Sequence, residues 1–150
     1  MTDLPHRPTL FIDRNSGGRI FRELIEKEGI GVVLHDDCFK QNTPDETWIN
    51  EVSARGWIVV TCDVDTTRSP LFLRNLKLSV TGRVFLLNGL EGGSREEKAA
   101  CVLRNYETML EICRKREPPL FWRINREGGA TVVDFKHKLG LLRKAGKSPT

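Results

Sequence analysis

The chain has 150 residues, of which 39% are hydrophobic and 29% are charged, a balance typical of a soluble protein with a single core. No run approaches the roughly 20 apolar residues that a membrane-spanning helix needs. Residues 1–8 contain no apolar signal region. We therefore expect one domain that stays in the cytoplasm and does not contact a membrane.

The formal net charge of +4 is concentrated at the end of the chain. Residues 136–150 contain five Lys or Arg and no acid, whereas acids and bases nearly balance in the rest. We interpret residues 1–135 as the folded domain and residues 136–150 as a basic C-terminal tail. That tail could contact phosphate or an acidic partner, or it could be a solvated terminal segment.

Apolar strand-like runs alternate with helical patterns, which predicts an α/β fold with a mainly parallel sheet covered by helices. Strands are expected at about residues 9–13, 31–35, 57–62 and 83–87. Helices are expected between Gly18 and Gly29, from Thr43 to before Gly56, from Ser69-Pro70, and over about 94–116. Residues 120–124 and 131–133, joined through Gly128-Gly129, are expected to form an antiparallel hairpin.

The second expected helix has a strong start signal, Thr43-Pro44-Asp45-Glu46. Thr43 is predicted to cap the helix, with Pro44 at the first helical position and Glu46 at the third, as in a capping box. Asp45 would gain from the helix dipole in the same turn.

The four cysteines show no spacing that suggests a zinc site, because none forms a CxxC pair and no histidine lies at a matching interval. We interpret them as buried, reduced thiols: Cys38, Cys62, Cys101 and Cys113.

Acidic residues near the ends of two expected strands are the most informative feature of the chain. Asp13 closes the first strand, Asp63 closes the third, and Asp65 follows two residues later. Asp45 begins the intervening helix, at the turn that returns to the same edge of the sheet. The carboxyl ends of parallel strands meet at one edge, where α/β folds place their binding sites.

Carboxylates gathered in this way repel one another. Two like charges about 4 Å apart repel by roughly 4 kcal/mol at an effective dielectric of 20, so a proton or a cation must lie between them. Because carboxylate oxygens are hard ligands, the cluster predicts a site for Mg²⁺ or Mn²⁺. The acid pair in His35-Asp36-Asp37 also follows a strand, but we interpret it as a solvated loop.

Residues Asp63-Val64-Asp65-Thr66-Thr67 offer a competing interpretation, because a strand followed by DxDxT is the first motif of haloacid-dehalogenase-type phosphatases. In such an enzyme Asp63 would attack phosphorus and Asp65 would act as the acid/base. That family also needs an acidic pair after a later strand, and the fourth expected strand ends in Asn88-Gly89 instead.

Four stretches of the chain together resemble the PIN-like domain nucleases, in particular the branch of VapC-type toxin ribonucleases. They are Phe11-Ile12-Asp13-Arg14-Asn15, Leu34-His35-Asp36-Asp37, Thr43-Pro44-Asp45-Glu46-Thr47-Trp48 and Gly56-Trp57-Ile58-Val59-Val60-Thr61-Cys62-Asp63. The resemblance covers most of residues 9–126. It implies a three-layer α/β/α fold with an acidic pocket that binds Mg²⁺ or Mn²⁺ and cleaves RNA.

Carried over position by position, the resemblance makes Asp13, Asp45 and Asp63 the catalytic and metal-binding acids, with Asp65 as an accessory fourth ligand. Where relatives tend to have a basic residue between the positions of Thr61 and Asp63, this chain has Cys62, so a contact to phosphate is expected to be missing. The resemblance further implies a cognate antitoxin that blocks the pocket and a homodimer, as in many relatives.

Three basic or polar residues near the acids are candidates for holding the RNA backbone: Arg14, Asn15 and Arg68. Trp48 and Trp122 are interpreted as core residues rather than stacking surfaces. A third hypothesis is a non-catalytic PIN-like module that uses the same fold only to bind RNA or a protein.

Overall fold

The computed structural model describes residues 7–135, and the predicted basic tail lies outside them. The strands are β1 (Leu10–Ile12), β2 (Val32–Leu34), β3 (Ile58–Thr61), β4 (Arg83–Asn88), β5 (Leu120–Asn125) and β6 (Ala130–Val132). The helices are α1 (Arg19–Glu26), α2 (His35–Cys38), α3 (Asp45–Ala54), α4 (Val64–Arg68), α5 (Pro70–Ser79) and α6 (Arg95–Lys115). None of the helices within residues 7–135 is both long and apolar enough to cross a membrane.

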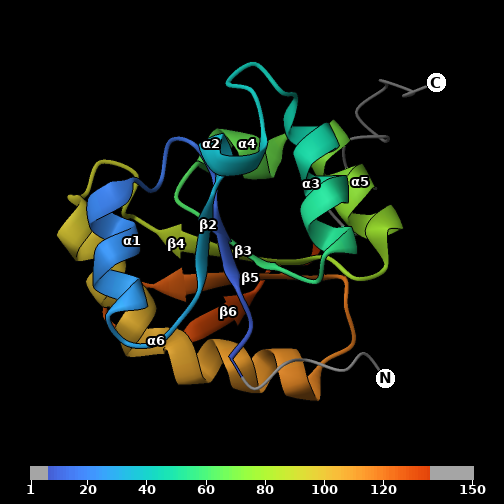
Figure 1. Cartoon of the computed structure of the whole chain (residues 1–150). Helices are drawn as coiled ribbons and strands as arrows, with labels where there is room; N and C mark the ends of the chain where they lie inside the picture. Colours follow the sequence, from blue (N-terminus) through green and yellow to red (C-terminus); the bar gives the residue numbers. More distant parts are fainter. Residues whose placement is uncertain (1–6, 136–150) are drawn as a thin grey trace.

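The strands form one sheet in the order β2-β1-β3-β4-β5-β6 (Figure 1). β1 to β5 pair in parallel, and β6 pairs antiparallel with β5 through the predicted hairpin. The α/β class and the mainly parallel sheet are thus as predicted. The chain goes from β1 outward to β2 and then continues on the other side of β1 with β3. The order of the strands therefore reverses between β1 and β3, and α/β folds bind ligands beyond the carboxyl ends of strands at such a point.

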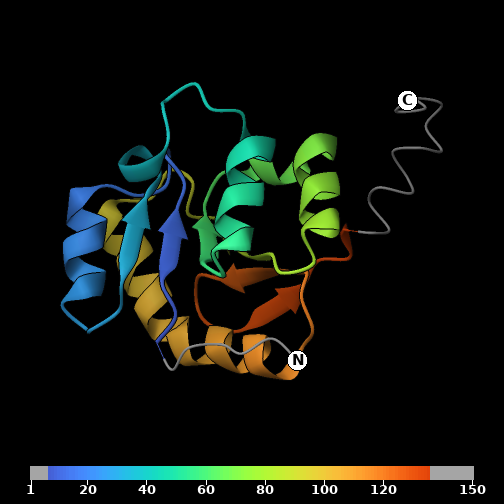
Figure 2. The same cartoon turned by 45° about the vertical axis from the view of Figure 1, so that its right-hand side comes forward.

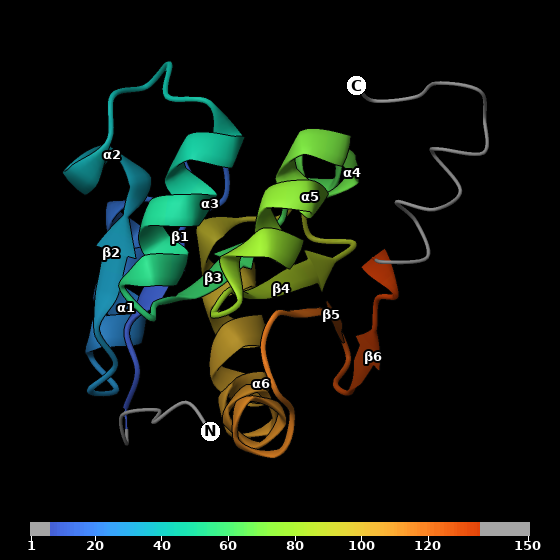
Figure 3. The same cartoon turned by 90° about the vertical axis from the view of Figure 1, so that its right-hand side faces the viewer.

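Two separate apolar cores lie on the two faces of the sheet. Residues of α1 and α6 pack on one face, and residues of α3 and α5 pack on the other. Figure 2 shows α1 and α3 on opposite sides of β1 and β2, and Figures 1 and 3 show α3 and α5 side by side. Alternation along the strands feeds both cores, since Leu10 and Ile12 face one and Phe11 faces the other.

The start of α3 differs from the prediction. The helix begins at Asp45, and Pro44 occupies the cap position without any side-chain cap hydrogen bond. The expected capping box of Thr43 and Glu46 is therefore wrong. Pro44 supplies its carbonyl to the amides of Thr47 and Trp48 instead, at 3.0 and 3.3 Å. Asp45 consequently lies at the first helical position, where its carboxylate faces the positive end of the helix dipole.

Two short helices at the carboxyl edge of the sheet were not predicted. The residues that follow β2 form α2 rather than a loop, and those that follow β3 form α4. Both are too short to show helical periodicity in the sequence. Both lie at the same end of the sheet, α2 beyond β2 and α4 next to α5 (Figures 1 and 3), at the edge that carries the acidic residues.

The loop after β1 leaves no room for a side chain at Gly17. A Cβ built there would lie 2.3 Å from Cγ2 of Ile12, the residue before Asp13. We expect Gly17→Ala to lower the free energy of unfolding by about 1–3 kcal/mol, as overpacking does. Gly92→Ala is the control, because a Cβ at Gly92 meets nothing within 4 Å, and it should stay within about 0.5 kcal/mol. Equal urea midpoints for both variants would contradict this description of the loop.

Candidate functional site

Asp13 is the most constrained acid of the site. It directly follows β1, and its side chain is buried, with 6% exposure. Its Oδ1 atom is buried without a hydrogen-bond partner among the described residues. A buried carboxylate oxygen without a partner costs free energy unless a proton or a cation compensates it.

The surroundings of Asp13 disfavour its charged form. Burial raises the pKa of this carboxyl from 3.8 to about 6, and the negative charges of Asp63 and Asp45 add to the rise. The hydroxyls of Ser16 and Thr61 lower the pKa, but by less than burial raises it. Asp13 therefore keeps its proton up to about pH 6, well above the range of an ordinary aspartate, and is mostly ionised at pH 7.

Asp63 and Asp45 are joined by a single hydroxyl group. Thr66 Oγ1 lies 2.9 Å from Asp63 Oδ2 and 3.2 Å from Asp45 Oδ2. A threonine hydroxyl has one proton, so it cannot fully satisfy both carboxylates. The two acids, one from the end of β3 and one from the start of α3, are thus close together. The single hydroxyl between them leaves their negative charges uncompensated.

Each of these two carboxylates is held in place by a second contact. Asp63 caps α4, because its Oδ1 accepts the amide of Thr66 at 3.1 Å. Asp45 Oδ1 accepts the indole N–H of Trp48 at 2.8 Å, one turn along α3. Asn15 Nδ2 lies 3.5 Å from Asp63 Oδ2. The Trp48 indole and the Thr66 amide thus hold the Oδ1 atoms, while the Oδ2 atoms share the Thr66 hydroxyl beside one common space.

That space is a small open pocket of about 120 Å³ at the carboxyl edge of β1 and β3. We call it the acidic pocket, because three of the predicted acids line it: Asp13, Asp45 and Asp63. The other lining residues are Arg14, Asn15, His35, Gln41, Thr43, Trp48 and Thr66. None of the salt bridges within residues 7–135 involves Asp13, Asp45 or Asp63. Basic side chains of the described region therefore leave the three carboxylates unpaired.

Two predicted site residues lie elsewhere. Asp65 and Arg68 are both exposed on α4 and do not line the acidic pocket. Because α4 is helical, Asp65 is turned away from the side of the helix on which Thr66 meets the acids. The predicted roles of Asp65 and Arg68 remain predictions. Another carboxylate comes to this edge instead, since Glu91 accepts the amide of Val64 at 3.3 Å.

Sequence reasoning missed the groups that hold the acids. Trp48 was interpreted as a core residue, and it is buried, but its indole also fixes Asp45. A buried Trp needs a partner for its N–H, and an acid three residues earlier on a helix is a suitable one. His35, which was predicted to end the second strand, is also buried and lines the acidic pocket.

Cys62, which lies between Thr61 and Asp63, is excluded as a reactive group. Burial raises the pKa of the Cys62 thiol to about 12, although the charge of buried Lys98 opposes this rise. The thiol is therefore protonated at neutral pH and unsuited to be a nucleophile or a metal ligand. The chemistry of the site rests on its oxygen atoms.

The acids do not form a preformed metal cage. In residues 7–135, no group of three or more His, Cys, Asp or Glu side chains has an arrangement that would hold a metal ion. The donors nevertheless fit Mg²⁺ or Mn²⁺ in type, because these cations take carboxylate oxygens. Mg²⁺ in particular is usually bound through one or two carboxylates, with waters and substrate phosphate completing its coordination. The unpartnered Asp13 oxygen is where such a cation would compensate the site.

Comparison with known families agrees with this geometry. A family model described as a PIN like domain matches residues 8–88. The chain belongs to this family. The matched residues run from before β1 to the end of β4 and include Asp13, Asp45 and Asp63. Searches of curated proteins and of solved structures each found no match.

PIN-like domains are commonly nucleases, enzymes that hydrolyse phosphodiester bonds. The VapC-type branch is not distinguished by the family match.

The raised pKa of Asp13 predicts how stability varies with pH in this PIN-like domain. The folded protein keeps the Asp13 proton up to about pH 6, whereas the unfolded chain releases it near 3.8. Folding therefore gains from Asp13 at low pH, and we expect about 3 kcal/mol to be lost as the pH rises through this window.

Urea unfolding in EDTA at a series of pH values measures this loss. Asp13→Asn cannot titrate, so the stability of the variant relative to wild type should increase from pH 4 to pH 7. The other acids titrate in both proteins, so their contributions cancel in the difference between the two unfolding free energies. Parallel curves for the two proteins would show that Asp13 has an ordinary pKa.

Proposed function

We propose that this protein is a metal-dependent endoribonuclease that hydrolyses phosphodiester bonds at the acidic pocket. The observation that carries the proposal is the buried, unpartnered oxygen of Asp13 beside two carboxylates that share one hydroxyl. Such an arrangement is costly for a purely structural site. It is useful where a cation and a phosphate bind, and membership of the PIN-like family supports this use.

Asp13, Asp45 and Asp63 would hold Mg²⁺ or Mn²⁺ in this proposal. The cation, when bound, would polarise the phosphoryl oxygens and lower the pKa of a bound water. Thr66 and Trp48 keep the carboxylates of Asp63 and Asp45 in position. Such prepositioning matters because misplacement of reacting groups by about 1 Å can cost 100-fold in rate.

Arg14 and Asn15 are placed to contact the RNA backbone. Both are exposed and both line the acidic pocket. The guanidinium of Arg14 is only weakly engaged, with Nε 3.9 Å from Asp36 Oδ1. It is therefore free to donate to a phosphate oxygen, for which its planar fork is well suited.

The resemblance to VapC-type toxins extends the proposal to biological role. We propose that the protein is the toxin of a toxin–antitoxin pair, with a cognate antitoxin that blocks the acidic pocket. The support is the order and spacing of the four matching stretches, and a homodimer and a cytoplasmic location are expected on the same ground. A small open reading frame overlapping this one would support the pairing.

The two other hypotheses make different demands on the site. A haloacid-dehalogenase-type phosphatase needs Asp65 to act on the substrate beside Asp63, and Asp65 does not line the acidic pocket. A non-catalytic module needs no unpartnered carboxylate. The nuclease is therefore the function that the geometry supports best.

Substitution of the acids tests the nuclease. We expect Asp13→Asn and Asp63→Asn each to lower Mn²⁺-dependent RNA cleavage by about 100-fold or more, because each removes charge that stabilises the metal-assisted transition state. Glu107→Gln is the matched control, since Glu107 is exposed on α6 and distant from the pocket in sequence and fold. Cleavage that survives in both Asn variants would indicate a contaminating nuclease.

A phosphatase assay separates the competing enzyme. If p-nitrophenyl phosphate is turned over and Asp65→Asn abolishes the turnover, the phosphatase hypothesis is correct. Calorimetry that detects RNA binding but no Mg²⁺ or Mn²⁺ binding would favour the non-catalytic module.

Metal binding should also stabilise the fold. We expect Mn²⁺ at about 100 times its Kd to raise the free energy of unfolding of the wild type by about 2.7 kcal/mol. At one fixed Mn²⁺ concentration the gain should be larger at pH 7.5 than at pH 5, because protons compete for Asp13 below its pKa of about 6 and raise the apparent Kd. Thermal unfolding with and without Mn²⁺ measures the gain, and equal stabilisation of Asp63→Asn would place the metal elsewhere.

A further inference from the structure

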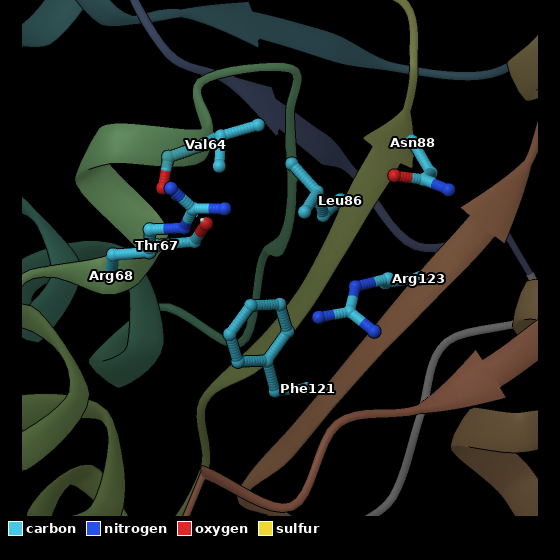
Figure 4. A pocket seen from close by; sticks show the side chains of 7 residues that line it. All are labelled: Val64, Thr67, Arg68, Leu86, Asn88, Phe121 and Arg123. Carbon is cyan, nitrogen blue, oxygen red and sulfur yellow. Dashed lines mark hydrogen bonds between the residues drawn. The ribbon is translucent and has the colours of Figure 1, made fainter. Parts of the chain in front are cut away.

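A second pocket opens at the same edge of the sheet, between α4 and the ends of β4 and β5. It has a volume of about 240 Å³. We call it the arginine pocket. Figure 4 shows the residues that line it: Val64, Thr67, Arg68, Leu86, Asn88, Phe121 and Arg123. Among these residues, only Arg68 was predicted from the sequence to bind substrate.

The fold explains why the pocket is polar at its mouth and apolar at its floor. Leu86 and Phe121 belong to the core under α3 and α5, where they form the floor. Side chains alternate along a strand, so Asn88 and Arg123 come next on the same face. Leu86 and Arg123 are also partners in the β4–β5 register. The apolar face of the sheet thus changes into a polar one towards the carboxyl ends of these strands.

Two cations converge in the arginine pocket. The guanidinium groups of Arg68 and Arg123 both point into the space between α4 and β5 (Figure 4). No carboxylate lines the pocket, and within residues 7–135 neither arginine forms a salt bridge. Arg123 is half-buried, so its charge is partly removed from water without compensation.

Such a site favours an anion that accepts several hydrogen bonds. Two guanidinium forks can donate to a phosphate at once, and the side-chain amide of Asn88 adds a further donor. The hydroxyl of Thr67 is already committed, because it donates to the Val64 carbonyl at 2.9 Å. The arrangement matches the tetrahedral oxygens of a phosphate better than a single planar carboxylate.

The helix α4 separates the arginine pocket from the acidic pocket. Thr66 lines the acidic pocket and contacts its carboxylates, while Thr67 and Arg68 line the arginine pocket. A chain with regularly repeated phosphates could therefore cross this five-residue helix and occupy both pockets. Resting on the proposed ribonuclease function, we propose that the arginine pocket binds an RNA backbone phosphate beside the one that is cleaved.

Substrate length gives the sharpest test. A dinucleoside monophosphate has only the scissile phosphate, whereas oligonucleotides with an added nucleotide on either side also present a neighbouring phosphate. We expect wild type to prefer one of the longer substrates. The preference is measured as the ratio of kcat/KM for that oligonucleotide to kcat/KM for the dinucleoside monophosphate. Arg123→Gln should reduce that ratio about tenfold, since it removes a charged hydrogen-bond donor to phosphate. Arg123→Lys should restore part of it, because Lys keeps the charge but lacks the planar fork.

Arg114→Gln is the matched control. Arg114 is exposed on α6, against the opposite face of the sheet, and it should leave the ratio unchanged. Circular dichroism melts of all variants show whether any of them has lost the fold. A ratio that Arg123→Gln does not change, in a folded protein, would overturn the proposal.

A second experiment measures RNA binding without cleavage and so does not depend on catalysis. In the Asp63→Asn background, the slope of log K against log salt for a single-stranded RNA falls by about 0.7 for each phosphate that the protein no longer neutralises. We expect Arg68→Gln and Arg123→Gln each to reduce RNA affinity and to flatten this slope, and Arg114→Gln to do neither.

These arms separate the two proposals. If no substrate is cleaved but the arginine variants weaken RNA binding and flatten the slope, the arginine pocket stands and the nuclease fails. If the variants lose affinity for inorganic phosphate or for an acidic peptide while RNA binding and its slope stay the same, the RNA subsite is overturned.

Discussion

The burial of one carboxylate, that of Asp13, is the constraint on which the site depends. β1 lies inside the sheet with β2 on one side and β3 on the other, so the residue that follows it has little access to water. The order of strands reverses at this place, which puts the ends of β1 and β3 next to each other. Burial and two nearby charges together raise the Asp13 pKa. The free-energy cost of ionising a buried carboxyl therefore falls on this single residue.

The carboxyl edge of the sheet combines opposite charges in adjacent pockets. Short α4 makes this combination possible, because successive residues of a helix face different directions. Thr66 meets carboxylates on one side, and Arg68 enters the arginine pocket on the other. A nucleic acid that is cut by a metal-assisted reaction needs both environments: acids that hold a cation, and cations that hold the backbone.

The sequence predicted the sheet and the place of the acids better than it predicted the local turns. Apolar runs identified the strands, and parallel pairing then brought Asp13 and Asp63 to one edge. From the DxDxT pattern alone Asp63 and Asp65 would share a face, since residues i and i+2 do so in an extended chain. Asp63 caps a helix instead, which turns Asp65 to solvent. Arg123 was not predicted because its partner Arg68 is 55 positions away, and only the folded sheet and α4 bring them to one pocket.

A carboxyl-carbon NMR titration of Asp13, performed first in EDTA and then in saturating Mg²⁺, tests the central claim most directly. We expect a midpoint near pH 6 without metal and a clear downward shift with Mg²⁺, because a bound cation favours the ionised carboxylate. A midpoint that Mg²⁺ does not move would show that Asp13 does not share a cation with its neighbours.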